Sequence, residues 1–416
     1  MNEMKNYLLV FLCFLGFNSM AQKEKDFYKD KINEVTKTVD LVVDYNVNNQ
    51  DNEDDSKKLQ KAINDLSSLK NGGVINIPAG QYYINDIVLK SNVHLVIDKG
   101  VTLYATNPEV NKNFIMISFG NNRHRAKNVS IRSKEGMYTA DLSVSQNKNV
   151  RVINVANAEN FLIEGLRVAD DNTIFSAITL NYSSFKGNYS MPENGVIKNC
   201  RIEKSHYGYG LIQAQASKNI YYENIWGDGG VTLRLETSLT KMNDLQIGGN
   251  HDTFAKNVYC ENGNAAVMLS PHNIQNGHVE IDGIETVNCG FTVRISKGYI
   301  AGKQTGENLM PGTYANTSKL SNIKSTYGTT AQVKSKHFKY MTCKDRKLIN
   351  GHSPDGISYV APSVAPIINT AKGIGGKEKG YWEIKIKNIS TSGYVNQKKE
   401  ILHEEDAGLC QSKNNK

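Results

Sequence analysis

The segment "GGVTLRLETSLT", residues 229–240, brings together residue types that could do chemistry on a sugar. Side chains alternate along a strand, so we expect one inward and one outward set. The inward set is Val231, Leu233 and Leu235, and the outward set is Thr232, Arg234, Glu236 and Ser238. An arginine beside a glutamate makes a poor core and a candidate saccharide site. A serine then stands where a second acid would be expected.

Gln213, His272 and Arg294 are further polar residues of types that suit such a site. A structural alternative stays open for several of these residues. Glu236 beside Arg234 also describes an ordinary surface ion pair. His272 in "SPHN" could cap a strand end at a turn, and Gln213 could belong to an internal ladder of Gln and Asn side chains.

A weak repeat organises the chain and would position these residues. An apolar residue, a polar one, Asn or Gly, and another apolar residue recur, with the third position at Gly165, Asn199, Asn224, Gly283 and Asn388 and degenerate copies at Asn262 and Asn322. These markers lie 34, 25, 38, 21, 39 and 66 residues apart. A unit of about 21–25 residues with insertions predicts an all-β fold, a right-handed parallel β-helix, with one coil per repeat. The asparagines suit left-handed corners between strands.

Coil spacing predicts that the polar residues gather. In a parallel β-helix, a residue lies about 4.8 Å from its partner one coil onward. Counted from the nearest preceding marker, the offsets are 14 residues for Gln213, 12 for Glu236, 10 for His272 and 11 for Arg294. We therefore expect these four side chains on one strip of one face, with Arg234 beside them.

The segment "DSKKLQKAINDLSSL" at 55–69 spaces its apolar residues as one amphipathic helix, with Asp55 or Ser56 as N-cap. Short β-branched runs follow it, so this helix is expected to cap the solenoid. The expected organisation is a polar segment over 22–54 and a β-helix core with its cap helix over 55–300. A further coil or coils with an inserted lobe would occupy 301–380, and the last coil and a tail 381–416.

Residues 1–21 have the form of a secretory signal peptide, with Lys5, an apolar run over 7–17 and a small-residue end at Ala21. The apolar run is shorter than the about 20 residues that span a membrane. We therefore expect a secreted, soluble protein. The net charge of +8 predicts a polyanionic partner, either nucleic acid or an acidic or sulfated polysaccharide.

Five cysteines follow the predicted signal peptide: Cys200, Cys260, Cys289, Cys343 and Cys410. Their odd number and the lack of a CxxC pair argue against a disulfide framework and against a zinc site, so no metal ligands are predicted. Cys200 takes the inward position of its repeat and is expected to be a buried, inert thiol.

Four segments, "YGLIQAQASKNI", "GGVTLRLETS", "AAVMLSPHNIQNGHVEIDGIETVNCGF" and "VRISKGY", resemble the iota-carrageenases, family 82 of the glycoside hydrolases. The resemblance runs from about Asn149 to Tyr299 and fades in the inserted region and at the C-terminus. Members of that family are secreted β-helices that hydrolyse β-1,4 bonds of a sulfated red-algal galactan with inversion. The resemblance makes a sulfated galactan the expected partner, rather than nucleic acid or a membrane, and we expect a monomer.

The resemblance also implies roles for individual residues. It implies Glu236 as general acid, Gln213 and His272 as supports for water and substrate, and Arg234 and Arg294 as sulfate-binding positions. It implies no cofactor for the chemistry and allows a structural calcium or sodium ion.

One position departs from the family, whose catalytic segment reads Glu-Thr-Asp with the aspartate as general base. Here the segment is Glu236-Thr237-Ser238. Residues i and i+2 of a strand lie about 6.5–7 Å apart, which matches the spacing of an inverting acid and base. The missing carboxylate is therefore the one that would deprotonate water, and a serine hydroxyl needs a base of its own to do so.

Three functions stay open on the sequence. The first is an inverting hydrolase of iota-carrageenan or a related sulfated galactan, whose base is a water held by Gln213 and His272 or a residue of the following loop: Asp244, His251 or Asp252. The second is a β-helix that binds sulfated glycan with little or no catalysis. The third is a polysaccharide lyase or polygalacturonase that uses the carboxylate pair Asp170 and Asp171.

Overall fold

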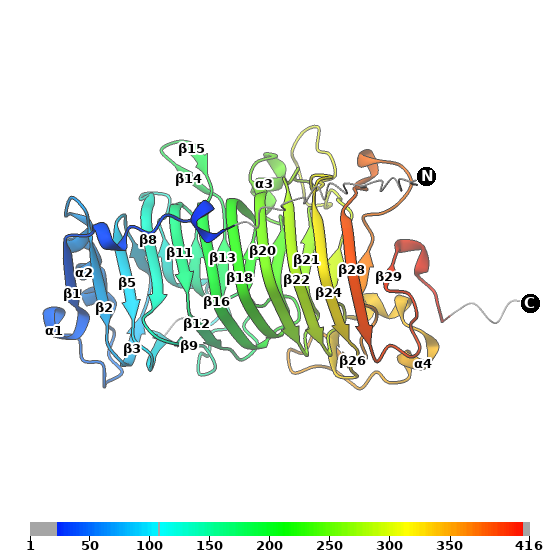
Figure 1. The fold of residues 1–416 in the computed structure, drawn as a ribbon, viewed down its shortest axis with the longest axis horizontal. Helices are drawn as coiled ribbons and strands as arrows, with labels where there is room; N and C mark the ends of the chain where they lie inside the picture. Colours follow the sequence, from blue (N-terminus) through cyan, green and yellow to red (C-terminus); the bar gives the residue numbers. More distant parts are fainter. Residues whose placement is uncertain (1–22, 107–108, 411–416) are drawn as a thin grey trace, which may run out of the picture.

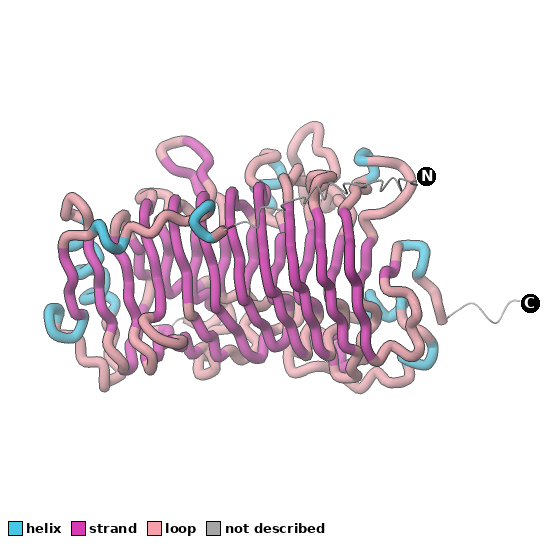
Figure 2. The backbone as a smooth tube through the Cα atoms, viewed as in Figure 1, coloured by secondary structure: helices cyan, strands magenta, loops and turns pink. Residues whose placement is uncertain are grey.

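The computed structural model describes residues 23–106 and 109–410, which form a right-handed parallel β-helix, as predicted (Figure 1). The predicted signal peptide lies outside the described residues. The coils stack into a rod, with the first strands at one end and the last at the other (Figure 2). Loops project from the rod at the corners between strands. The stacked coils place side chains from different strands next to one another.

The larger of the two long sheets in the described residues has 15 strands and is called the long sheet below. Its main path is β1 (Lys37–Asp40), β2 (Gly73–Ile77), β5 (Val93–Ile97), β8 (Ala126–Ser133), β11 (Ala158–Glu164), β16 (Glu193–Ser205), β18 (Ala216–Gly229), β20 (Gly249–Glu261), β22 (Val279–Val287), β24 (Lys319–Thr326) and β28 (Lys385–Ser392). Four more strands pair beside this path: β3 (Gly80–Ile84), β6 (Val101–Ala105), β9 (Tyr138–Asp141) and β12 (Leu166–Ala169).

The second sheet faces the long sheet across the core and has 10 strands in the described residues. In spatial order they are β29 (Ile401–Leu402), β27 (Ile367–Asn369), β23 (Val293–Ile295), β21 (Ala265–Ser270), β19 (Val231–Glu236), β17 (Ile212–Ala214), β13 (Ile178–Leu180), β10 (Val150–Val155), β7 (Phe114–Phe119) and β4 (Ile87–Leu89). A small hairpin, β14 (Ser183–Phe185) with β15 (Asn188–Ser190), projects from the rod (Figure 1).

The predicted asparagine corners form, but one asparagine used as a repeat marker is not the one that stacks on the preceding coil. Asn199 and Asn224 adopt left-handed φ angles of 53° and 51°, and the Asn224 side-chain amide donates to Oδ1 of Asn199 at 3.2 Å. The next rung is Asn257, which donates to Asn224 at 2.9 Å. Asn262 instead donates to Asp228, at a different corner. The offset of His272 was counted from Asn262 and is therefore five residues shorter than the offset from Asn257, which stacks on Asn224. Both asparagines occupy left-handed corners of the same strand pair, so the sequence alone does not distinguish them.

The predicted cap helix is α2 (Ser56–Ser67), with Asp55 at its N-cap position. It packs on the first strands β2, β4 and β5, together with the short helix α1 (Leu41–Tyr45). Its buried side chains are Leu59, Ala62, Ile63 and Leu66. Each fully buried Leu or Ile contributes about 1.5–3 kcal/mol, so the helix removes the open end of the apolar core from water.

Residues 23–34 cross the outer face of the long sheet (Figure 1). Phe27 stacks on Tyr221 of β18 with ring centroids 5.2 Å apart and contacts Phe254 of β20 at 5.3 Å. Glu24 forms a 2.8 Å ion pair with Lys198 of β16. The segment predicted only as a polar lead-in therefore covers apolar side chains on four neighbouring strands, β11, β16, β18 and β20.

The alternation predicted for 231–236 holds in part. Leu233 and Leu235 lie in the main core, as expected. Val231 lies instead in a second buried cluster with Met268 and residues of the lobe. The pairing of β19 with β21 passes from Val231 to Leu233 without Thr232, whose hydroxyl donates to the Tyr259 carbonyl at 2.7 Å. This local irregularity interrupts the alternation, so Val231 does not face the main core.

A lobe leaves the coil between β24 and β27, over residues 327–366. It contains the hairpin β25 (Ala331–Val333) with β26 (Tyr359–Ala361), the 3-10 helix η3 (Ser335–Tyr340) and the helix α4 (Cys343–Arg346). Its apolar residues pack on the outer face of the second sheet, against Met268 of β21 and Ile368 of β27. The lobe therefore stands on the same face as the predicted site.

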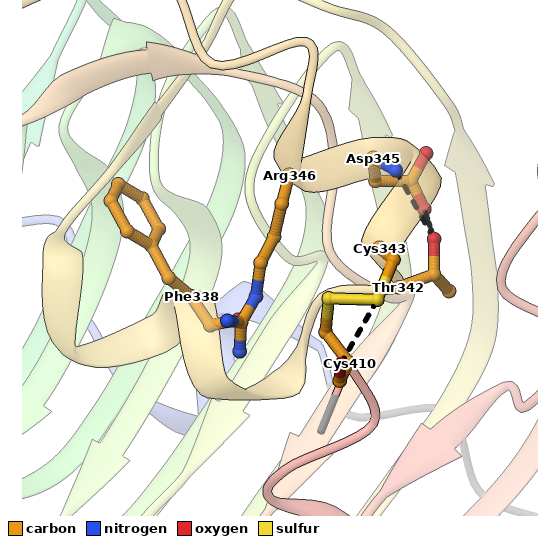
Figure 3. Close-up of a disulfide and its surroundings, with 6 residues drawn as sticks. All are labelled: Phe338, Thr342, Cys343, Asp345, Arg346 and Cys410. Atoms are coloured by element: carbon orange, nitrogen blue, oxygen red, sulfur yellow. Dashed lines mark hydrogen bonds between the residues drawn. A yellow bond between two sulfur atoms is a disulfide. The ribbon is translucent and has the colours of Figure 1, made fainter. Parts of the chain in front are cut away.

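The expectation that the cysteines form no disulfide framework needs one correction, because Cys343 of α4 is bonded to Cys410 near the C-terminus (Figure 3). The chain returns to α4 after its last coil, which brings the two Cα atoms to 4.7 Å. Cys200, Cys260 and Cys289 are free and buried, as expected of Cys200. Burial raises the pKa of the Cys200 thiol to about 12, so this thiol is inert at neutral pH.

Candidate active site

A line of polar side chains runs along the outer face of the second sheet. Gln213 of β17 is paired with Arg234 of β19, Arg234 with Met268 of β21, and Met268 with Arg294 of β23. Gln213, Arg234 and Arg294 thus share one row across four coils. Glu236 lies two residues further along β19, and the sequence-predicted strip is therefore two adjacent rows rather than one.

Glu236 is the centre of this group. Its side chain is 15% exposed, and Arg234, whose side chain is 10% exposed, donates to its Oε2. Gln213 Nε2 donates to the same oxygen from the preceding coil at 3.3 Å. His272 Nε2 lies 3.5 Å from Oε1. A guanidinium, an amide and an imidazole therefore surround one carboxylate.

The end of β19 is fixed by its neighbours, which sets the direction of Glu236. Tyr314 donates its hydroxyl to the Leu235 carbonyl at 2.7 Å. Thr237, fully buried, donates its hydroxyl to the Pro271 carbonyl at 2.6 Å. Buried hydrogen bonds of this kind are costly to break, so they hold the backbone on both sides of Glu236 in place.

The charge on Glu236 follows from its surroundings. Burial raises the pKa of this carboxyl, but the charge of Arg234 and the His272 contact, with Arg294 further off, lower the pKa to about 2. Glu236 is therefore ionised at neutral pH in the free protein. A general acid must carry a proton, so a bound substrate has to change this balance.

His272 lies in the turn after β21 in a left-handed conformation with φ of 47°. Its backbone carbonyl accepts from the N–H groups of Tyr299 and Gly312 at 2.7 and 2.8 Å. The Tyr299 ring packs on the imidazole with centroids 4.7 Å apart, and its hydroxyl lies 3.2 Å from Nε2. The turn proposed as the structural alternative for His272 is present, and this turn aims the ring at Glu236.

Ser238 pairs with a residue that the sequence reasoning missed. Gln215 Nε2 donates to Ser238 Oγ at 3.0 Å, and the Ser238 N–H donates to Gln215 Oε1 at 2.6 Å. Gln215 is 5% exposed. The serine therefore has a neutral amide partner, and none of its hydrogen bonds within the described residues is to a base. Gln215 was detectable, since it stands two residues after Gln213 on the same face.

None of the three loop residues named as alternative bases is bonded to Glu236, and two of them have other partners. The Asp244 carboxylate, in α3 (Thr240–Asp244), accepts from the Thr305 N–H at 2.8 Å. His251 and Asp252 lie on β20 of the long sheet, and the His251 ring contacts the Gly248 carbonyl at 3.0 Å. No hydrogen bond or ion pair among the described residues joins any of them to Glu236.

The carboxylate pair considered for a lyase has local partners. Asp170 accepts from the N–H and hydroxyl of Thr173 at 3.1 Å each. Asp171 forms a 2.8 Å ion pair with Lys148. These contacts account for both acids as turn-forming and surface residues.

The described part of the chain contains no cluster of three or more His, Cys, Asp or Glu side chains able to hold a metal ion. The structure therefore offers no carboxylate cluster for the calcium or sodium ion that the family resemblance allowed. None of the helices in the described residues has the length and apolar character that crossing a membrane requires.

Comparison with known proteins identifies the chain's relatives. No profile of a known protein family matches it. It is 34% identical over 412 residues to an iota-carrageenase of Zobellia galactanivorans, covering 86% of this chain and 83% of that protein. A solved 1,3-alpha-1,4-beta-D-galactose-4-sulfate-3,6-anhydro-D-galactose-2-sulfate 4 galactohydrolase superposes with a TM-score of 0.87 at 27% identity, covering 93% of this chain and 95% of that one.

A second solved structure, an iota-carrageenase complexed to iota-carrageenan fragments, superposes with a TM-score of 0.85 at 26% identity, covering 92% and 94% of the two chains. The relative and both structures each cover more than four fifths of this chain. Sequence identity over most of both chains, with the same β-helix, leads to one assignment. This chain belongs to the iota-carrageenase family.

Proposed function

We propose that this protein is an inverting glycoside hydrolase that cleaves β-1,4 linkages of iota-carrageenan or a closely related sulfated galactan, with Glu236 as general acid. The observation that carries the proposal is the buried Glu236 carboxylate among Gln213, Arg234 and His272, on the outer face of a β-helix of this family. Export through residues 1–21 is part of the proposal, because the polymer is too large to enter a cell.

Arg234 gives the substrate a way to protonate Glu236. In the free protein its guanidinium binds the carboxylate and also lies over the Tyr209 ring, with Cζ 5.2 Å from the centroid. A sulfate group of the substrate competes for the same guanidinium, since its fork matches tetrahedral oxyanions. Loss of the arginine contact leaves the burial of Glu236 less opposed, which raises its pKa. Glu236 therefore carries the proton that a general acid needs only when a sulfated sugar is bound.

The water that attacks the sugar must be positioned by side chains, and a base must accept its proton. Gln213 and His272 both contact Glu236, so we place the water between them. The His272 imidazole is the side chain of this pair that can accept a proton, and Tyr299 orients it. The imidazole lies 3.5 Å from Glu236 in the free protein, closer than the about 6.5–9.5 Å between an inverting acid and base, so substrate and water must separate the two side chains before His272 acts as the base. Ser238 and Gln215 occupy the neighbouring position, and neither side chain is charged.

The test compares wild type with Glu236→Gln on purified iota-carrageenan, following reducing ends and product size. The glutamine keeps the shape and its amide cannot act as the acid, so turnover should fall about 10²-fold or more. Binding of the polymer should persist. Gln275→Ala is the matched control, since Gln275 is exposed and contacts none of the residues named here. Wild-type turnover in Glu236→Gln would exclude Glu236 as the acid.

A second candidate function is binding of sulfated glycan with little catalysis, and Ser238 is the observation that favours it. The family's base is a carboxylate, and here a hydroxyl bonded to the neutral Gln215 takes that place. Saturable binding of iota-carrageenan by the wild type without any release of products over hours would select this function instead.

A further inference from the structure

A second row of side chains runs along the outer face of the long sheet, two residues after the Asn or Gly corner of each coil. The register joins its members across seven strands, from β12 to β28: Arg167, Arg201, Trp226, Tyr259, Glu285, Lys324 and Ser390. At about 4.8 Å per coil, the row extends for about 29 Å along the rod. Its side chains point away from the core, and the core separates them from Glu236 on the second sheet. The proposed hydrolysis uses none of them.

Three members of this row stack on one another. The Arg201 guanidinium lies over the Trp226 ring, with Cζ 4.3 Å from the centroid. Tyr259, from the following coil, lies parallel to the Trp226 ring, with centroids 6.1 Å apart and an interplanar angle of 6°. The Tyr259 hydroxyl donates to Glu261 of the same strand at 3.1 Å, which holds the ring in place. The next coil has Glu285 at this position, and no further aromatic ring among the described residues packs on Tyr259.

A groove begins where this stack ends. Its volume is about 630 Å³, within the about 300–1,000 Å³ that is typical of ligand sites. Four successive coils of the long sheet, at β20, β22, β24 and β28, build it. Its polar lining includes Asn257, Tyr259, Glu285, Asn322, Lys324 and Asn388. The groove therefore runs parallel to the rod for about 14 Å, which is three coil spacings.

Gly283 leaves room in this groove next to Tyr259. The corner position of the two neighbouring coils is an asparagine, Asn257 with φ of 56° and Asn322 with φ of 55°. Gly283 takes the same corner with φ of 75° and has no side chain. The ladder of asparagine amides is interrupted there, because Asn322 donates to Oδ1 of Asp282 at 2.6 Å instead of to a preceding asparagine. The missing side chain and the uncovered Tyr259 ring both line the groove.

The lining suits a sugar ring. A sugar has C–H groups on its faces and hydroxyl groups on its edges, so it needs an apolar plane and hydrogen-bonding groups beside that plane. The Tyr259 ring supplies the plane. The Glu285 carboxylate accepts hydrogen bonds from hydroxyl groups, and the asparagine amides both donate and accept. Glu285 is paired with Lys324 at 2.7 Å, but exposed ion pairs contribute little to stability, so a ligand can take over both side chains.

The shape of the groove and its apolar plane favour one class of ligand, a galactan chain. The substrate named for the related solved hydrolase contains 3,6-anhydrogalactose. The ether bridge of this sugar replaces two hydroxyl groups, which makes its ring more apolar than that of ordinary galactose. In the described residues the long sheet ends at β28, so a long chain that lies in the groove can continue past the end of the sheet.

We propose that this groove is a second glycan-binding site, separate from the active site, in which a galactan chain lies along the rod with an anhydrogalactose ring against Tyr259. The inference rests on the proposed function, because it takes the polymer from it. Binding at the groove holds the protein on the polymer while the active site is empty. Held in this way, the active site meets a higher local concentration of cleavable linkages.

Two variants test the groove by different means. Tyr259→Ala removes the aromatic plane. Gly283→Asn fills the groove with the residue that neighbouring coils carry at the same corner, and asparagine tolerates the left-handed conformation. The added Cβ would lie 3.0 Å from Oδ1 of Asn257, whose exposed side chain can move aside. Lys256→Gln is the control, since Lys256 is exposed on the same strand as Tyr259 but lies outside the groove.

The first measurement is the Kd for iota-carrageenan, with every variant also carrying Glu236→Gln so that the polymer stays intact. The Kd should rise about tenfold in Tyr259→Ala and in Gly283→Asn, as expected for the loss of one aromatic contact, and should not change in Lys256→Gln. The second measurement is kcat/KM without Glu236→Gln, on the polymer and on a hexasaccharide. Both groove variants should lose activity on the polymer through KM and keep wild-type activity on the hexasaccharide, which needs the active site alone.

An unchanged Kd in both groove variants would overturn the proposal. Equal losses on polymer and hexasaccharide would also overturn it, because they would show damage to the active site. A wild type that sediments as a dimer, with Gly283→Asn as a monomer, would show that the groove receives a second copy of this chain instead. If the wild type releases no products but the Kd values change as expected, the proposed hydrolysis fails and the glycan-binding groove stands.

Discussion

Replacing Arg234 by methionine removes the charge that keeps Glu236 ionised, and the size of the effect follows from the structure. The pKa of Glu236 is about 2, against an ordinary value of 4.5. This difference of about 2.5 units equals about 3 kcal/mol, at about 1.4 kcal/mol per unit. Both side chains are at most 15% exposed, so solvent screening removes little of it. Breaking a buried ion pair by deleting one partner costs a similar amount, about 3–5 kcal/mol.

The dependence on pH has a definite sign. The folded-state pKa of Glu236 is depressed, so its contribution to the free energy of unfolding is present above about pH 4.5 and is lost as the pH falls toward 2. Between pH 6 and pH 3 the wild type should lose about 2 kcal/mol of this contribution. In Arg234→Met the burial of the carboxyl is less opposed, so its pKa rises and this loss should shrink.

The assay is a double-mutant cycle of wild type, Arg234→Met, Glu236→Gln and the double variant, by denaturant unfolding at pH 6 and pH 3 after checking reversibility. We expect a coupling of about 3 kcal/mol at pH 6 that falls to about 1 kcal/mol at pH 3. A coupling near the about 0.5 kcal/mol of an exposed ion pair, or one that is equal at both pH values, would refute the reasoning.

Three further predictions concern the substrate, the base and the lobe. Arg294→Ala should weaken binding of sulfated galactan without unfolding the protein, and raised salt should weaken wild-type binding; equal binding of desulfated galactan would contradict the sulfate role. Ser238→Asp should change turnover by less than about tenfold, because the proposed water network already supplies the base and the added charge stands near a bound sulfate; a larger gain would show that the base was lost. Cys343→Ser should destabilise the lobe by up to about 4 kcal/mol, because the bond to Cys410 closes a 67-residue loop; unchanged proteolysis of residues 327–366 would contradict this.

Much of the fold could be predicted from the sequence because the residue patterns that determine it are local. Asn199 and Asn224 mark left-handed corners that few other residues adopt, and the structure gives both that conformation. The position of the cap helix followed from its 3.6-residue apolar spacing. The marker at Asn262 was wrong for a physical reason: coils differ in length through their insertions, so a count along the chain cannot tell which of two asparagine corners stacks on Asn224.

The candidate site was readable only in part. Arg234 and Glu236 share a face because a strand repeats every two residues, whatever the rest of the chain does. Gln215 repeats the same spacing one coil earlier and was overlooked. The groove beside Tyr259 carried one signal, the glycine that interrupts the asparagine series at Gly283, but a count along the chain does not show which side chains stack.

The sequence by itself determined the β-helix, its corners, the outward Arg234–Glu236 pair and the departure at Ser238, because each depends on residues close together in the chain. The tertiary structure decided what surrounds that pair: Gln213 from the preceding coil and His272 from a turn in the following one. These contacts join residues 23 and 36 positions apart. It also decided the groove beside Tyr259, which four coils build together. Stacking and insertion length set these arrangements, and neither is encoded in a short stretch of sequence.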